Sequence, residues 1–274
     1  MTTRFDADTA VMKVGEDASG EMTFEGRVGT VWRVARGANG GYVAALMLRA
    51  MEMALGDPSR PPRSLTIHYL APTEEDTFRV RIQVERSGRT LATLSARLIQ
   101  RGKTIAIALA AFGAARESMV FGEARMPEIP PPESLPALHP PTPGVPSFSR
   151  QYDYRWALGD PPFSGSDSSR VGGWLRLGEP RVADALLVAA MMDAWMPCVF
   201  PRLEQPISAP TIDLTIHFRT QLPLATARPD DFYCAVFSSR LAADGYFEED
   251  GELWSRDGQL LAHSRQLAML PIVR

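Results

Sequence analysis

A five-residue segment that occurs twice is the feature that most limits how this chain can fold. Residues 65–69 (LTIHY) return as residues 214–218 (LTIHF), about 150 positions further along the chain. A hairpin-type turn recurs with them, first at 101–103 and again at 256–259 with one extra residue. A repeat of this length is too long for a solenoid. Duplication of a half-domain is therefore the simplest explanation.

A proline-rich segment separates the two copies. Residues 127–146 hold nine prolines in twenty positions. Proline lacks a backbone N–H, so such a run favours an extended, stiff connection over a sheet or helix. We therefore expect an N-terminal half-domain over residues 1–118, a linker over 119–147 and a C-terminal half-domain over 148–274.

The same order of elements is predicted on each side of this linker. In the first half, apolar periodicity predicts a strand, a helix and four strands, at residues 22–28, 42–55, 64–70, 78–86, 90–100 and 104–112. In the second half it predicts two strands, a helix and four strands, at residues 148–156, 173–177, 182–196, 211–218, 232–240, 246–255 and 259–270.

The second predicted helix indicates how the elements pack. Nearly every residue from 185 to 199 is apolar, and a helix that is apolar on all faces must be enclosed by other structure. One helix wrapped by a strongly curved antiparallel sheet meets this requirement. The expected fold class is therefore α+β, with two such units side by side and their sheets continuing into one another.

Composition and charge exclude several function classes. The formal net charge of −3 and the pI near 5.9 give no basic footprint for nucleic acid. The sequence has no apolar stretch of about 18 residues and no signal-type N-terminus, so we expect no membrane span. Two cysteines give no disulfide framework, and a cytoplasmic location fits.

Asp193 is the first candidate for chemistry. It is the only charged residue in the apolar stretch 185–199 of the second predicted helix. A carboxylate in a low-dielectric interior needs donors nearby or a shifted pKa, and such residues are frequent in functional sites. The alternative is an ordinary water-facing Asp at the frayed helix end, one turn before Pro197.

Gln266 and Thr211 are candidates because the first half has no counterpart for either. Strand alternation puts Gln266 on a small, apolar face, and the hairpin register aligns it with Ala110. Thr211 aligns with Pro62. Both repeat positions thus carry a polar residue only in the second half, which favours a functional site that is present in one copy. The alternatives are a satisfied core amide and a structural Thr at a strand start.

Gly40 and Gly41 precede the first predicted helix. Glycine permits a ligand to approach the backbone, and the free N–H groups of a helix start attract a developing oxyanion. The N–H groups of Gly41 and Tyr42 are therefore candidate substrate contacts. An ordinary glycine-rich turn is the alternative.

The histidines and cysteines do not complete a site in the sequence. His68 and His217 occupy the same repeat position, which favours a structural role for both, while His139 and His263 do not complete a metal site. Cys198 has no His near it in sequence and is expected to be a buried thiol. Nucleophile-elbow and phosphate-loop motifs are absent from the sequence.

Six ordered segments resemble the acyl-CoA thioesterase II family, over nearly the whole chain. They are 39–41 (NGG), 64–72 (SLTIHYLAP) and 84–89 (VERSGR) in the first half, and 192–193 (MD), 210–213 (PTID) and 262–266 (AHSRQ) in the second. The resemblance implies a double hot-dog fold, with two curved antiparallel sheets that each wrap a central helix and a pseudo-twofold repeat in one chain.

The resemblance also implies a reaction. In that family an Asp, a Thr and a Gln hold and activate the hydrolytic water, and the matching positions are Asp193, Thr211 and Gln266. It implies an acyl-CoA substrate, no metal or other cofactor, and no nucleic-acid partner. A homo-oligomer is expected because such sheets leave edges and flat faces to cover.

Two other function classes stay open at this stage. A hot-dog enoyl-CoA hydratase pairs its acid with a His on the helix, and neither predicted helix contains a His. A non-catalytic acyl-CoA or lipid-binding protein is the other alternative, and binding without turnover would favour it.

Overall fold

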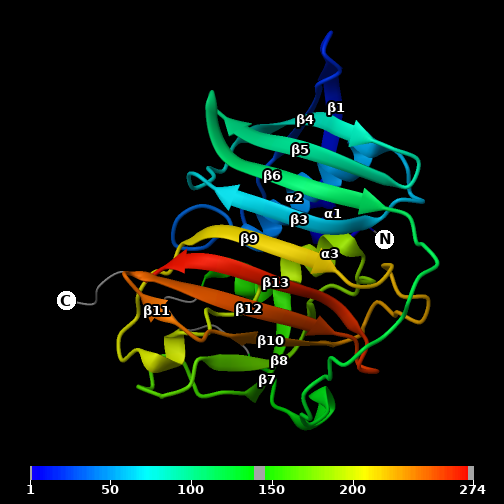
Figure 1. Ribbon diagram of the computed structural model, residues 1–274. Coiled ribbons are helices and arrows are strands. Elements are labelled where there is room, and N and C mark those ends of the chain that lie inside the picture. The colour runs from blue at the N-terminus through cyan, green and yellow to red at the C-terminus, as the bar shows by residue number, and fades with distance from the viewer. Residues whose placement is uncertain (1, 139–145, 271–274) are drawn as a thin grey trace.

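The strands of the described residues belong to one long antiparallel sheet, with the helices packed on one side of it (Figure 1). This computed structural model describes residues 2–138 and 146–270. Residues 139–145 of the expected linker, His139 among them, lie outside the described residues.

The elements of the first half are two helices and six strands. They are α1 (Arg4–Asp8), β1 (Val11–Glu16), β2 (Met22–Arg27), α2 (Gly40–Leu55), β3 (Pro62–Tyr69), β4 (Thr77–Ser87), β5 (Leu91–Gln100) and β6 (Lys103–Gly113). Four strands and the helix match the prediction closely, and β2 matches within one residue. The sequence patterns did not indicate α1 or β1.

From its first strand onward the second half repeats the order that starts at β1, with one additional two-residue strand. Its elements are β7 (Tyr152–Leu158), β8 (Arg170–Leu177), α3 (Ala185–Met191), β9 (Thr211–Phe218), β10 (Tyr233–Ser238), β11 (Ala242–Ala243), β12 (Tyr246–Trp254) and β13 (Leu260–Met269). Short 3-10 turns lie at Pro132–Ser134, Ser147–Gln151 and Phe200–Arg202. The second turn occupies the first residues of a predicted strand, so β7 begins four residues later than expected.

The sequence repeat pairs with itself at the centre of the sheet. The strand order is β1-β2-β4-β5-β6-β3-β9-β13-β12-β10-β8-β7, which reads as the same series from either end. At the middle β3 pairs with β9, Thr66 opposite Thr215, and the two hydroxyl oxygens lie 3.1 Å apart. The described strands therefore form one continuous sheet, in which the parts from the two halves continue into one another through this pair.

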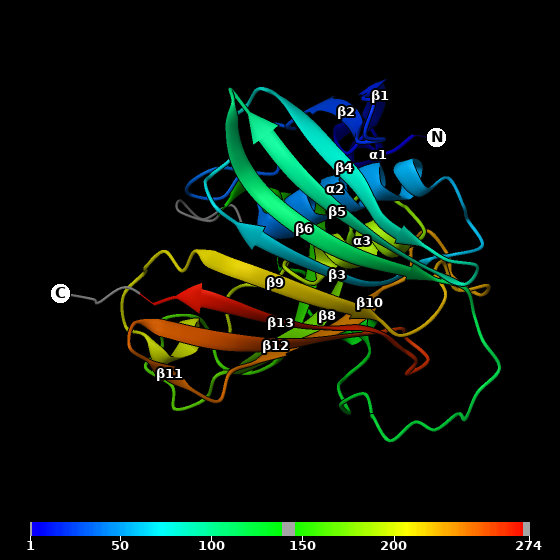
Figure 2. The same cartoon turned by 45° about the horizontal axis from the view of Figure 1, so that its top comes forward.

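The sheet bends across the helices. Figure 2 shows β3, β4, β5 and β6 passing over α2. The helix of the second half, α3, lies beside α2. The residues of α2 from Gly41 to Leu48 are all buried, as are all residues of α3. The prediction that an all-apolar helix must be enclosed is confirmed for α3.

The second helix is shorter than predicted, and this moves Asp193. Asp184 caps its N-terminus by accepting the Leu187 N–H at 3.0 Å, so Val182 and Ala183 precede the helix. After Met191 the α-helix gives way to a tighter turn, in which the Asp193 N–H donates to the Ala190 carbonyl at 3.3 Å. Pro197 then prevents the helix from continuing. Asp193 therefore lies in the turn that follows α3, not in the helix.

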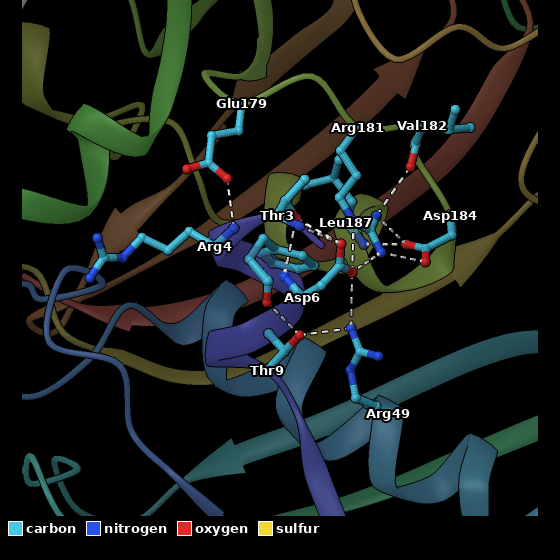
Figure 3. A network of polar contacts seen from close by, with 11 residues as sticks. Thr3, Arg4, Asp6, Thr9, Arg49, Glu179, Arg181, Val182, Asp184 and Leu187 are labelled. Carbon is cyan, nitrogen blue, oxygen red and sulfur yellow. Dashed lines mark hydrogen bonds and ion pairs between the residues drawn. The ribbon is translucent and has the colours of Figure 1, made fainter. Parts of the chain in front are cut away.

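A polar network fixes α1 against both longer helices (Figure 3). Asp6 of α1 forms ion pairs with Arg181 at 2.9 Å and with Arg49 of α2 at 3.4 Å. Arg181 also binds Asp184, the N-cap of α3, through two hydrogen bonds. Burial acts to raise the pKa of Asp6, but the hydrogen bonds from Arg181 and Thr3 prevail and lower it to about 2. The network thus connects α1 to the middle of α2 and to the N-terminus of α3.

The close contact of α2 with α3 gives a stability prediction. A Cβ atom added at Gly41 would lie 2.4 Å from the Ala190 carbonyl oxygen, closer than such atoms approach. We expect Gly41→Ala to lower the free energy of unfolding by roughly 2–3 kcal/mol, because backbone must move. Urea unfolding measures this, with Gly15→Ala as control, since nothing lies within 4 Å there. Equal stability of the two variants would contradict the packing described.

Candidate active site

The carboxylate of Asp193 lies on the N-terminus of α2, so each half supplies one side of the contact. Its Oδ2 accepts the Gly41 N–H at 2.9 Å and the Asn39 side-chain amide at 3.0 Å. The Asn39 amide also donates to the Asp193 carbonyl at 2.8 Å, and its oxygen caps α2 on the Tyr42 N–H at 3.0 Å. Asp193 thus occupies the positive end of a 16-residue helix.

The pKa of Asp193 is suited to proton transfer. Burial, and to a smaller extent the charge of Glu249, raise the pKa of Asp193 from the ordinary value of 3.8 to about 7, against the hydrogen bonds from Gly41, Gly40 and Asn39, which lower it. Asp193 as a whole residue is half-buried. A carboxyl group with this pKa is an effective general base near neutral pH.

Thr211 and Gln266 are in direct contact. The Thr211 hydroxyl donates to Gln266 Oε1 at 2.9 Å, and Gln266 is 5% exposed. Simple alternation from the buried Leu214 and Ile216 would turn Thr211 to the outer face. A β-bulge at Ile212 sets Thr211 opposite Ala268 on the inner face instead. Sequence reasoning had no signal for this bulge.

Glu249 is a site member that the sequence analysis missed. It lies opposite Gln266 in the β12–β13 pair, and its Oε1 accepts the Gln266 amide at 2.5 Å. Its Oε2 accepts the backbone N–H of Cys198 at 2.5 Å, five residues after Asp193. Alternation along β12, which buries Phe247, Glu249 and Gly251, was the signal that could have found it.

The observed register supports the comparison of halves. Leu65 pairs with Ala110 in the first half, and its repeat partner Leu214 pairs with Gln266 in the second. Gln266 therefore stands where the first copy has Ala110, as the hairpin alignment predicted.

The helix-start N–H groups are engaged inside the protein. The Gly41 N–H donates to the Asp193 carboxylate, and the Tyr42 N–H donates to the Asn39 side-chain oxygen. The Tyr42 hydroxyl donates to the Asp8 carbonyl at 2.6 Å. The Gly40 carbonyl accepts the Tyr69 hydroxyl at 2.8 Å. Gly40 and Gly41 allow the close approach of Asp193, but the expectation that both N–H groups face a substrate does not match this arrangement.

Of the remaining candidates, the two repeat histidines lie apart from this cluster, and Cys198 contacts it through its bond to Glu249. His68 and His217 are exposed on the outer face of the sheet, opposite to Gln266, and Cys198 is buried with its thiol pKa raised by burial. Within residues 2–138 and 146–270 no three His, Cys, Asp or Glu side chains gather in a metal-binding group. Nor does any described helix have the length and apolarity that crossing a membrane needs.

A surface pocket lies away from these residues. It is at the β5–β6 turn and is lined by Ala71, Pro72, Glu74, Gln100, Arg101, Lys103 and Ile105. None of the candidate site residues borders it.

Comparison with solved structures identifies the class of protein. The chain is similar to a hot-dog-fold protein of unknown function from Alicyclobacillus acidocaldarius, with a TM-score of 0.89, 29% identity and complete coverage of both chains. A putative thioesterase II from Thermobifida fusca gives a TM-score of 0.83 at 24% identity over 99% of this chain and 98% of that one. The fold is therefore a hot-dog fold.

Comparison of sequences identifies the family. Residues 29–113 match the acyl-CoA thioesterase N-terminal domain, and residues 127–270, more than half of the chain, match the acyl-CoA thioesterase C-terminal domain. The chain belongs to the acyl-CoA thioesterase family. It is also 26% identical to an uncharacterized protein of Mycobacterium tuberculosis, over 90% of this chain and 91% of that one.

The raised pKa of Asp193 makes a prediction about stability. A carboxyl group whose pKa is higher in the folded state than in the unfolded state stabilises the fold at pH values below its unfolded-state pKa. For Asp193 this stabilisation is lost as the pH rises through about 7. Asp193→Asn keeps an acceptor for Gly41 but has no charge to bury. At pH 8 we expect the variant's free energy of unfolding, measured with urea, to exceed that of wild type by roughly 1–3 kcal/mol. This difference should shrink toward pH 5. A gain that is the same at both pH values would contradict this account.

Proposed function

We propose that the protein hydrolyses acyl-CoA thioesters to a free carboxylic acid and CoA. The observation that carries the proposal is the Asp193 carboxylate, half-buried and held on the start of α2, with a pKa near 7. Family membership supports the substrate class. The Thr211–Gln266 contact adds polar groups that only the second half contains.

Asp193 is the general base in this proposal. Its carboxylate takes a proton from water as the water oxygen attacks the thioester carbonyl carbon, which gives a tetrahedral oxyanion. Collapse of that intermediate breaks the carbon–sulfur bond, and Asp193 returns the proton to the departing CoA thiolate. The cycle leaves Asp193 ionised and needs no metal or other cofactor.

Thr211 and Gln266 hold the water in the same proposal. Their mutual bond leaves lone pairs on the Thr211 oxygen and a second N–H on Gln266 for a third partner. Such groups, fixed before the reaction, orient the water and stabilise the intermediate.

We assign oxyanion stabilisation to the Gly41 N–H. As Asp193 turns to the water, the substrate carbonyl replaces its Oδ2 as the acceptor of that N–H. The Tyr42 N–H stays on the Asn39 cap and has no direct role. Gly40 contributes by leaving room for Asp193, since a Cβ there would lie 2.9 Å from Oδ2.

Two structural expectations belong to the proposal as well. The half-domains keep the bounds 1–118 and 148–274, with 119–147 as linker. A homo-oligomer is expected because β1 is an edge strand of the sheet and exposes Met12 and Val14.

Release of free thiol from a panel of acyl-CoAs, acetyl to stearoyl and aromatic, tests the function. We expect turnover of at least one substrate and a fall in kcat of about 100-fold or more in Asp193→Asn. Thr211→Val and Gln266→Met should each lose roughly 10- to 100-fold. His217→Gln, changed on the outer face, should match wild type.

Two outcomes would contradict the proposal. Undiminished turnover in Asp193→Asn would exclude the mechanism. Binding of acyl-CoA by wild type without any thiol release would favour the binding-protein alternative.

A further inference from the structure

Glu249 is a buried carboxyl group that the proposed mechanism leaves without a task. It is 4% exposed, and none of the ion pairs formed by the described residues includes it. Its two oxygens are occupied by N–H donors, the Gln266 amide and the Cys198 backbone, each at 2.5 Å. A buried acid without a cation is unfavourable for folding, so its position needs another reason.

The internal repeat provides a comparison for this position. In the first half, Leu94 of β5 lies opposite Ala110, just as Glu249 of β12 lies opposite Gln266. Leu94 is fully buried, so an apolar side chain suits this place in the fold. Glu249 thus joins Thr211 and Gln266 as a polar residue found only in the second copy, and it accepts the hydrogen bond from the NH₂ end of the Gln266 amide.

The contact decides which end of the Gln266 amide faces which neighbour. Burial raises the pKa of Glu249, but both of its oxygens accept hydrogen bonds from N–H donors, which is the pattern of a carboxylate. A carboxylate can only accept hydrogen bonds, so it draws the NH₂ end of Gln266 toward β12. The amide oxygen must then face Thr211, and the Thr211 hydroxyl must donate to it. Without Glu249 the amide could turn over, and the direction of the Thr211 bond would reverse.

Glu249 is also held close to the segment that carries Asp193. A Cβ added at Gly251, two residues along β12, would lie 3.0 Å from the Met192 side chain. Cys198, whose N–H binds Glu249, follows Asp193 by five residues. Glu249 therefore lies against the segment that carries Asp193, and its charge contributes to the raised pKa of Asp193.

We propose that Glu249 is a positioning residue, which fixes the Gln266 amide so that Thr211 accepts a hydrogen bond from the attacking water. The inference rests on the proposed hydrolysis and deepens it. With its own proton committed to Gln266, the Thr211 oxygen offers only lone pairs. It receives one hydrogen of the water while Asp193 removes the other. The second N–H of Gln266 stays available to the developing oxyanion.

Glu249→Gln tests the bond directions with almost no change in shape. The Cys198 N–H is a fixed donor, so the new amide must turn its oxygen toward Cys198 and its NH₂ toward Gln266. Gln266 then turns over, and Thr211 is made to donate outward to the water. We expect kcat to fall by about tenfold or more with KM changed less than twofold.

The pH profile supplies a readout that a packing role would not move. Loss of the Glu249 charge removes a repulsion on Asp193, so the acid limb of kcat should shift to lower pH in Glu249→Gln. Glu252→Gln, on the exposed face of the same strand, is the matched control and should keep the wild-type kcat and acid limb. Thermal unfolding of each variant confirms that it folds.

A double variant tests whether Glu249 acts through Gln266. Once Gln266→Met has removed the amide, adding Glu249→Gln should lower kcat by less than twofold further. If Glu249→Gln does not fold, Glu249→Asp is the alternative variant, because it keeps the charge but shortens the side chain by one methylene. Its kcat should fall about tenfold or more, while the acid limb of its kcat profile stays near the wild-type pH.

The outcomes separate this inference from the proposed function. Wild-type kcat and pH profile in a folded Glu249→Gln or Glu249→Asp, or additive losses in the double variant, would overturn the role of Glu249. The hydrolysis proposal would survive if Asp193→Asn still abolished turnover. A wild-type protein that releases no thiol would overturn both.

Discussion

The hydrogen bond from the Gly41 N–H to the Asp193 carboxylate is the contact on which the rest of the site depends. It needs a helix start without side chains at Gly40 and Gly41, because a Cβ at either would meet Asp193 or the backbone behind it. It also needs the two halves to be held in register. The β3–β9 pair and the α1 network on Arg181 and Arg49 provide this. The acid is thus stabilised by one half and supplied by the other.

Duplication followed by divergence accounts for the asymmetry. The strand order and the two bulges, after Pro62 and after Thr211, are common to both copies. The first copy fills the equivalent inner positions with Pro62, Leu94 and Ala110, whereas the second has Thr211, Glu249 and Gln266. The same backbone therefore serves as a packed core in one half and carries polar groups in the other.

Much of this could be predicted from sequence because the repeat supplied its own comparison. Strands with clear alternation, such as β9, were predicted with the observed bounds, and Gln266 was found because its alignment with Ala110 was correct. The end of α3 could not be predicted, since apolar residues continue past it while the turn at Asp193 depends on packing against α2. Glu249 was hidden in an acidic run, where strand alternation alone distinguishes the buried carboxylate from its half-buried neighbours Glu248 and Asp250.

The central claim is that an ionised Asp193 with a pKa near 7 removes the proton from water. The pH dependence of kcat/KM for wild-type acyl-CoA hydrolysis tests this most directly, because it reports the pKa of the free enzyme's essential base. The account predicts activity that rises with pH through a midpoint of about 7. A profile that is flat between about pH 5 and 9, or one with its midpoint near the ordinary carboxyl value of about 4, would contradict it.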